Sequence, residues 1–247
     1  PFTTHLTHLG SDGALCSVAT CGSDWNSAGT GTYKPINFPT FSTIRPEPRM
    51  VLSDSGSSLI VIEKSAADKL YVIKLSDAGS VIWGSLTTPG SYVQIDDVNN
   101  ISAWQAESDA NGGLYIGYLN NPLGSNNLKI AKIESLGSWT IGSGTGGVTV
   151  KTISSPVTAD ALVSAADSSG NFFLGWNQTT SGEADAYVQK FDTLGVEQWT
   201  TGGVLLGTLG DTVSNYFEWI YTLNVPHNLV ADGTGGVIAA LNRMSPT

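Results

Sequence analysis

One pattern occurs three times in the chain: LYVIKLSDAG at residues 70–79, LKIAKIESLG at residues 128–137 and AYVQKFDTLG at residues 186–195. Each copy carries a lysine and ends on a glycine, and both recur at intervals of 58 residues: Lys74, Lys132 and Lys190, then Gly79, Gly137 and Gly195. A tryptophan follows each glycine closely, at Trp83, Trp139 and Trp199. Self-similarity at a fixed period of this length indicates a repeat architecture.

A second pattern alternates with the first. It is a turn cluster between two apolar runs, and its four copies begin at Asp54, Asp109, Asp167 and Asp232. The aspartate side chain caps such a turn, and a glycine supplies the positive φ that a tight hairpin needs. Each repeat therefore contains two hairpins and four strands. In the best copy these strands are expected at 161–166, 171–178, 185–192 and 196–201.

The third strands carry apolar side chains on both faces, as a sheet packed between two other sheets requires. In the first copy the two sets are Tyr71, Ile73 and Leu75, and Leu70 and Val72. Four-stranded antiparallel sheets repeated around an axis form a β-propeller. We therefore expect an all-β, single-domain propeller over residues 1–247.

The repeats are expected at about 49–103, 104–160 and 161–226, with a closing blade made from 227–247 plus 1–21. This arrangement favours four blades. Five blades, or a slice of a larger ring, are the alternatives.

Charge and hydropathy argue against two classes of function, nucleic-acid binding and membrane spanning. The net charge is −10, so the surface repels phosphate backbones and nucleic acid is not an expected partner. No apolar run approaches the roughly 18 residues of a membrane-spanning helix, so no membrane span is expected. The chain starts at Pro1, and we interpret it as processed, with its targeting segment removed.

The two cysteines, Cys16 and Cys21, lie in a stretch rich in glycine, serine and threonine. A disulfide between them would suit an oxidising compartment, and free thiols are the alternative. A metal site would need more ligands than two thiols.

The segments DSSGNFFLGW at 167–176 and DAYVQKFDTLGVEQW at 185–199 resemble the bacterial SBBP-type (beta-propeller) repeat. The resemblance is fair over residues 54–87 and 109–142 and faint at both ends of the chain. It implies a secreted or cell-surface protein of bacterial type, used as a structural or binding module.

Residues outside the repeat are the better candidates for function, because structural roles preserve a repeat. An aromatic and polar segment lies where the interval between turn clusters lengthens, and such mixtures bind sugars and extended peptides. Its candidate ligand-binding residues are Asn215, Tyr216, Phe217, Glu218, Trp219 and Tyr221. The alternative interpretation is a core-facing strand.

The repeated charged residues have structural interpretations. The aspartates are predicted to cap turns, with calcium binding as the alternative; no other cofactor is expected. The lysines are expected to lay their stems over apolar strand surface with the ammonium in solvent. The tryptophans are expected to pack between blades.

These observations favour a non-enzymatic, extracellular adhesion or binding module for a glycan or protein ligand. One alternative is a structural subunit of a filament or virion, which would assemble into multimers. Another is a glycan hydrolase or lyase with carboxylates such as Asp96, Asp97, Glu107 and Glu218 in one cleft. Three arginines, Arg45, Arg49 and Arg243, match the number that sialidase-type propellers use, but the aspartate turns lack the required spacing to tryptophan.

Overall fold

The computed structural model describes residues 4–6, 34–36, 49–53, 58–64, 69–84, 93–96, 101–120, 125–143, 145–154, 158–180, 183–208 and 229–240. All regular elements in these ranges are β-strands, which confirms the all-β prediction. Nothing in the same ranges forms a helix that is long and apolar enough to cross a bilayer.

Three antiparallel sheets make up most of the described chain. Sheet I contains β3 (Arg49–Ser53), β4 (Ser58–Lys64), β5 (Leu70–Ser76), β6 (Val81–Trp83) and β7 (Val93–Gln94). Sheet II contains β8 (Ile101–Ser108), β9 (Leu114–Asn120), β10 (Ser125–Ile133), β11 (Trp139–Ile141) and β12 (Val148–Ser154). Sheet III contains β13 (Thr158–Ala166), β14 (Phe172–Thr180), β15 (Glu183–Phe191) and β16 (Val204–Thr208). Two hairpins complete the described strands: β17 (Leu229–Ala231) with β18 (Val237–Ala239), and β1 (Thr4–Leu6) with β2 (Lys34–Ile36).

The outer strand of sheets I and II comes in two pieces that pair with the same neighbour. β6 and β7 both pair with β5, and β11 and β12 both pair with β10. In sheet III the first piece is only a bridge between Phe191 and Glu197, and β16 begins at Val204.

The fourth strand predicted at 196–201 is therefore wrong. A turn interrupts it, closed by the Gly203 N–H, which donates to the Thr200 carbonyl. Gly202 and Gly203 have φ angles of +83° and +96°, and extended pairing resumes only after them.

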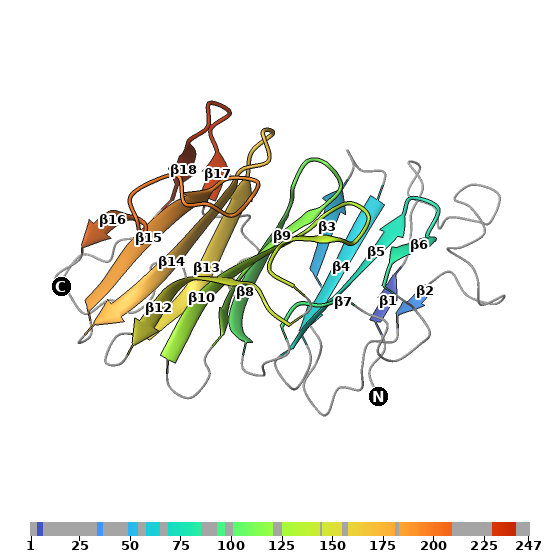
Figure 1. Ribbon diagram of the computed structural model, residues 1–247, viewed down its shortest axis with the longest axis horizontal. Coiled ribbons are helices and arrows are strands. Elements are labelled where there is room, and N and C mark those ends of the chain that lie inside the picture. The colour runs from blue at the N-terminus through green and yellow to red at the C-terminus, as the bar shows by residue number, and fades with distance from the viewer. Residues whose placement is uncertain are drawn as a thin grey trace.

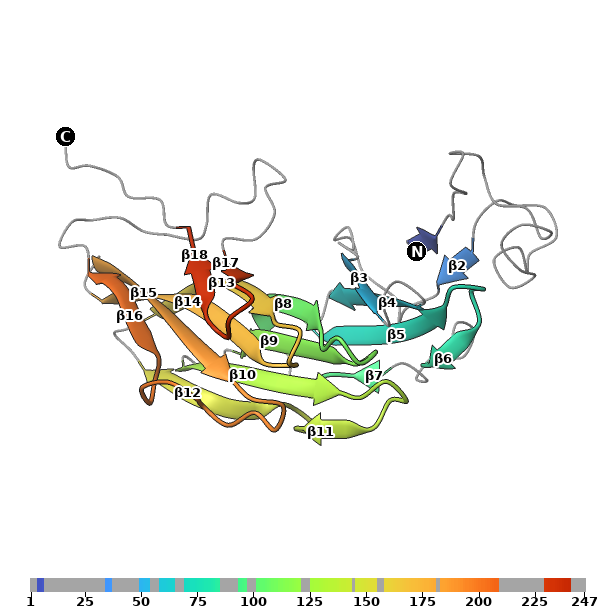
Figure 2. The ribbon, with the colours of Figure 1, turned by 90° about the horizontal axis from the view of Figure 1, so that it is seen from above.

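The three sheets follow one another along an arc (Figures 1 and 2). Their first strands, β3, β8 and β13, lie on the inner side of this arc together with β17, and the outer pieces β6, β12 and β16 lie on its outer side (Figure 2). β8 contacts both β3 and β13, and β13 contacts β17. Successive first strands are therefore neighbours, although their first residues, 49, 101, 158 and 229, lie 52, 57 and 71 positions apart in sequence.

A core of buried apolar side chains lies between each pair of neighbouring sheets. The first core joins sheets I and II and includes Ile60, Ile62, Trp83, Ile116 and Ile133. The second joins sheets II and III and includes Tyr115, Ile141, Phe172, Trp176 and Phe191. The third lies between sheet III and the β17–β18 hairpin and includes Val163, Phe173, Val188 and Leu229.

The three glycines of the first pattern occupy the same kind of turn. The φ angles of Gly79, Gly137 and Gly195 are +83°, +89° and +81°. Each glycine N–H donates to the carbonyl three residues earlier, at 2.8 to 3.0 Å. Gly137 packs on Trp83 of sheet I, and Gly195 packs on Ile141 of sheet II. All three glycines therefore close the same kind of turn, and Gly137 and Gly195 also lie against the preceding sheet.

The aspartate turns also share one geometry. Oδ1 of Asp109, Asp167 and Asp232 accepts the backbone N–H groups of the residues two and four positions later, at 2.7 to 2.9 Å. The prediction of turn capping is confirmed at these three positions, while Asp54 lies outside the described residues. No group of three or more potential metal ligands gathers within the described ranges.

The repeated lysines differ from expectation. Lys74 and Lys132 are buried, with 1% and 5% of their surface exposed, so their ammonium groups do not reach solvent. Lys74 Nζ donates to the carbonyl of Gly112 in the next sheet's aspartate turn, and Lys190 Nζ donates to that of Gly235 in the β17–β18 turn. Between sheets II and III the donor is the hydroxyl of Tyr115, which reaches the Gly170 carbonyl at 2.6 Å.

The tryptophans pack between sheets, as predicted. Trp83 lies in the core between sheets I and II, and its Nε1 donates to the Ser135 carbonyl of sheet II at 3.1 Å. Trp139 packs against the same core, and Trp199 packs on Phe173 with 5.7 Å between ring centres.

Candidate binding pocket at the first strands

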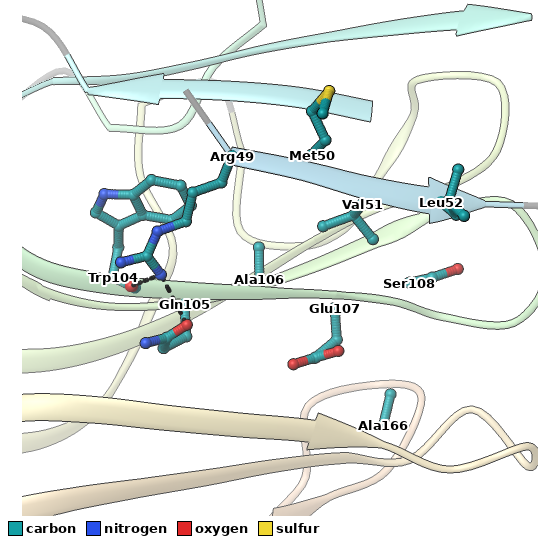
Figure 3. A pocket seen from close by; sticks show the side chains of 10 residues that line it. All are labelled: Arg49, Met50, Val51, Leu52, Trp104, Gln105, Ala106, Glu107, Ser108 and Ala166. Atoms are coloured by element: carbon teal, nitrogen blue, oxygen red, sulfur yellow. Dashed lines mark hydrogen bonds between the residues drawn. The ribbon is translucent and has the colours of Figure 1, made fainter. Parts of the chain in front are cut away.

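A pocket of about 420 Å³ opens where the first strands of the three sheets meet (Figure 3). β3 and β8 supply most of its wall, and Ala166 at the end of β13 completes it. The lining residues are Arg49, Met50, Val51, Leu52, Trp104, Gln105, Ala106, Glu107, Ser108 and Ala166. Most ligand pockets are concave sites of this kind, formed where several elements converge.

Strand alternation decides which side chains enter the pocket. Arg49 pairs with Ile62 and Val51 pairs with Ile60, so these β3 side chains share the face that turns toward sheet II. Met50 and Leu52 leave the opposite face of β3 (Figure 3). They are 61% and 67% exposed, although both are apolar.

Arg49 is held against β8 by three contacts. Its Cζ lies 4.5 Å from the centre of the Trp104 ring, a distance at which a guanidinium gains cation–π energy. Its Nη1 donates to Gln105 Oε1 at 2.8 Å and to the Trp104 carbonyl at 3.4 Å. These contacts fix a positive charge at the pocket wall, so little side-chain entropy remains to be lost when a ligand binds.

Two β8 side chains, Gln105 and Glu107, form hydrogen bonds with β13. Gln105 Nε2 donates to the Leu162 carbonyl at 2.8 Å, and Ser164 Oγ donates to Glu107 Oε1 at 2.8 Å. Gln105 therefore bridges all three sheets, since its Oε1 accepts from Arg49. The two bonds hold an amide and a carboxylate in fixed positions beside the guanidinium.

The pocket thus presents a guanidinium, an amide, a carboxylate and an indole within a small space. The guanidinium and the amide can donate to hydroxyl and carboxylate groups, the carboxylate can accept from hydroxyl groups, and an indole packs against an apolar ring face. Glu107 is the single carboxylate among the residues that line it. Hydrolysis by a pair of carboxylates would need a second one in the same cleft.

Comparison with protein-family models and with curated protein sequences finds no match for this chain. The chemistry of the site is therefore argued from the residues themselves.

The structure brings few of the predicted site residues together. The segment Asn215, Tyr216, Phe217, Glu218, Trp219 and Tyr221 lies outside the described residues, as do Cys16 and Cys21. Glu107 lines the pocket, whereas Asp96 does not: it is fully buried and bonds Tyr118, Asn120 and Lys129 of sheet II. Asp97 also lies outside the described residues.

Trp104 and Gln105 are site residues that were not predicted from the sequence. One signal for them was present in the sequence: Gln105 and Glu107 occupy alternate positions of the run that leads into the Asp109 turn, so both lie on one face of β8. Polar residues at such positions need partners from a neighbouring sheet, and these partners are Leu162 and Ser164.

Proposed function

We propose that this chain is a non-enzymatic β-propeller, secreted or carried on the cell surface, that binds a glycan through the pocket at its first strands. The observation that carries the proposal is the fixed Arg49–Gln105–Glu107 group beside Trp104. A protein ligand is the runner-up among possible partners, because Arg49 and Trp104 line the pocket and these residue types are common at protein–protein contacts.

The propeller part of the proposal is supported by the two outer faces of the sheet stack. On sheet I the apolar residues Met50 and Leu52 are exposed, and on the hairpin Val230 and Ile238 are 57% and 65% exposed. A stack that ended here would be expected to carry polar outer faces. Contact between the two apolar end faces would bury these side chains and close the sheets into a ring.

The closing blade would combine the β17–β18 hairpin with residues 1–21. In sheets II and III the third strand covers the preceding sheet through Ala131 and Ile133 of β10 and Phe191 of β15. In the described part of the β17–β18 hairpin no third strand covers sheet III in this way. A pocket of about 430 Å³ lies there between Trp199, Leu206 and Val237. A third strand from the N-terminal part would fill that position and give four blades, which requires residues 4–6 to exchange their pairing with residues 34–36 for pairing with the hairpin. Five blades, or membership of a larger ring, are the alternatives for the same faces.

The surface location rests on the resemblance of 167–199 to the bacterial SBBP-type repeat and on the acidic composition. Two alternatives to a binding role are a structural subunit of an extracellular filament or virion and a glycan hydrolase or lyase. Each predicts a different result in the experiment below.

The test is a glycan microarray of neutral and acidic oligosaccharides, probed with the whole chain and with two variants. We expect the wild type to bind a subset of these glycans. Arg49→Met should weaken binding by roughly tenfold or more, since a fixed interface arginine is often a hot spot. Lys69→Met removes a positive charge outside the pocket and should leave binding unchanged.

Three outcomes would overturn the proposal. The first is no binding to any glycan, and the second is equal loss of binding in both variants. The third is cleavage of the arrayed glycans, which would favour the enzyme. Ordered multimers in electron micrographs without glycan binding would favour the structural subunit.

A further inference from the structure

A buried polar cluster lies between sheets I and II, away from the pocket. Asp96, which follows β7, has no exposed surface, and Tyr118 and Asn120 of β9 have 0% and 1%. The side chain of Lys129 on β10 is 15% exposed. Charged and amide groups are seldom buried this deeply without a structural or chemical role.

Three donors converge on one carboxylate oxygen in this cluster. Asp96 Oδ2 accepts from the Tyr118 hydroxyl at 2.7 Å, from Lys129 Nζ at 2.9 Å and from Asn120 Nδ2 at 3.3 Å. The Tyr118 oxygen in turn accepts the Gly147 N–H at 2.6 Å, so the tyrosine is held in place. The lysine amine and the asparagine amide are therefore neighbours across one shared oxygen.

The strand register places the amine and the amide on the same side of sheet II. Lys129 on β10 pairs with Tyr118 on β9, and Asn120 lies two residues further along β9. Residues two apart on a strand point to the same face, so Asn120 is the diagonal neighbour of Lys129. A long side chain spans such a diagonal.

The side-chain carbonyl of Asn120 is also unusual, because it lacks a hydrogen-bond donor among the described residues. Its Oδ1 is buried and finds no hydrogen-bond partner in the described part of the chain. A buried amide oxygen without a donor is costly, on the order of 1–3 kcal/mol. The cluster thus holds an amine, a proton acceptor and an unsatisfied carbonyl side by side, with Asp96 and Asn120 buried and the amine at the edge of solvent.

We propose that Lys129 and Asn120 form an intramolecular isopeptide bond, with Asp96 as the catalytic proton carrier. The Lys129 ammonium first gives a proton to Asp96 Oδ2, and the free amine attacks Cγ of Asn120. The carbonyl electrons move to Oδ1 and return as the Cγ–Nδ2 bond breaks. Asp96 delivers its proton to the departing Nδ2, which also receives the second amine proton. The products are a Lys129–Asn120 amide, an ionised Asp96 and ammonium, and no oxidant or cofactor is consumed.

The arrangement favours this step for two reasons. The reactants are already held in place, which removes much of the entropic barrier of a reaction between separate molecules. Asp96 Oδ2 also contacts both Lys129 Nζ and Asn120 Nδ2, so one carboxylate can take a proton from the amine and return it to the departing nitrogen. The product closes residues 120–129 into a covalent loop at the turn end of the β9–β10 hairpin, so β9 and β10 would stay joined if the chain were cut between these two residues.

The test is the intact mass of the purified full chain under denaturing conditions. We expect a deficit of one ammonia relative to the mass calculated from the sequence. Lys129→Met, Asn120→Ala and Asp96→Ala should each restore the calculated mass. Asn127→Ala and Lys151→Met are the matched controls and should keep the deficit, because Asn127 bonds Thr152 and Lys151 lies over Tyr187 instead.

Trypsin provides a second measurement that does not depend on the folding of any variant. No lysine or arginine lies between Lys74 and Lys129, so the unmodified chain yields peptide 75–129. An acylated Lys129 resists trypsin, so we expect peptide 75–132 carrying the ammonia deficit. The calculated mass in the wild type, or cleavage after Lys129, would overturn the proposal. A deficit of one water, with Lys129 joined to Asp96, would overturn the assignment of Asn120.

Discussion

Single hydrogen bonds between sheets recur at one kind of position in this molecule. A donor from one sheet reaches the carbonyl of the glycine that lies three residues after the aspartate of the next aspartate turn: Lys74 to Gly112, Tyr115 to Gly170 and Lys190 to Gly235. Between sheets II and III the donor is a phenol hydroxyl instead of an ammonium group, but the acceptor is a glycine carbonyl in all three contacts. In sheet II, Lys132 instead lies 3.0 Å from Glu134 and 3.4 Å from Asp109. The acceptor carbonyl, not the lysine, is therefore the constant part of this contact.

Lys74→Met tests this contact. Methionine keeps most of the apolar stem but removes the donor, leaving the buried Gly112 carbonyl unsatisfied. We expect the free energy of unfolding to fall by about 1–3 kcal/mol, measured by urea denaturation. Leu136→Met, at a residue that is 83% exposed, is the control and should change it by less than about 0.5 kcal/mol. Equal effects of the two substitutions would show that the bond between the sheets contributes nothing.

Asp167 gives a pH-dependent prediction. Burial raises the pKa of its carboxyl group, but hydrogen bonds from Asn171 and Ser169 outweigh this and lower the pKa below the ordinary value of 3.8. A carboxyl group whose pKa is lower in the folded state stabilises the fold above its ordinary pKa. That contribution is lost as the pH falls below 3.8 through the folded-state pKa.

We therefore expect Asp167→Asn to destabilise the protein by about 1 kcal/mol at pH 7, and by less as the pH falls below the ordinary value of 3.8. Thermal unfolding followed from pH 7 to pH 2.5 measures the difference. A gap between wild type and variant that stays constant over this range would contradict the role given to the carboxylate.

The glycines in the turns have two roles: they adopt a positive φ, and some of them pack against the preceding sheet. Gly137 needs its positive φ, and it also lies against the preceding sheet: a Cβ there would meet Cβ of Trp83 at 3.1 Å. Gly233 has a φ of +79° but faces open space, with no atom within 4 Å of such a Cβ. Comparing substitutions at Gly137 and Gly233 therefore distinguishes the cost of backbone strain from the cost of lost packing between sheets.

Gly137→Ala should consequently cost more stability than Gly233→Ala. Both variants suffer the strain of a left-handed alanine, about 1–2 kcal/mol. Gly137→Ala should lose about a further 1 kcal/mol, because the added methyl pushes against Trp83. Chemical denaturation of the two variants measures the difference, and equal losses would contradict the close packing of successive sheets.

At the scale of the whole molecule, the apolar end faces carry the proposed ring. Ile238 belongs to the hairpin face that would meet sheet I on closure, while Leu136 is 83% exposed at a turn of sheet II. If the ring closes, Ile238→Glu buries an unpaired charge and should destabilise the protein by about 2 kcal/mol or more. Leu136→Glu stays at the surface and should change stability by about 0.5 kcal/mol at most. Small and equal effects, measured by thermal unfolding, would mean that the two faces do not meet.

Local chemistry alone determined the strands and turns of this protein. Alternating apolar residues, capping aspartates and glycines act within a few residues, so the all-β class, the hairpin order and the turn geometry could be predicted from the sequence. The interrupted outer strands could not, because the turn before β16 depends on Gly202 and Gly203 adopting positive φ next to Trp176.

Only the tertiary structure decided which residues meet. Arg49, Gln105 and Ser164 come from three different sheets, and they approach one another because the first strands lie side by side on the inner edge of the arc. Lys74 and Lys132 are buried for the same reason, since a lysine near a strand end meets solvent or a carbonyl according to how the next sheet stacks. The offset between stacked sheets is a sum of many weak contacts, and no short stretch of sequence encodes it.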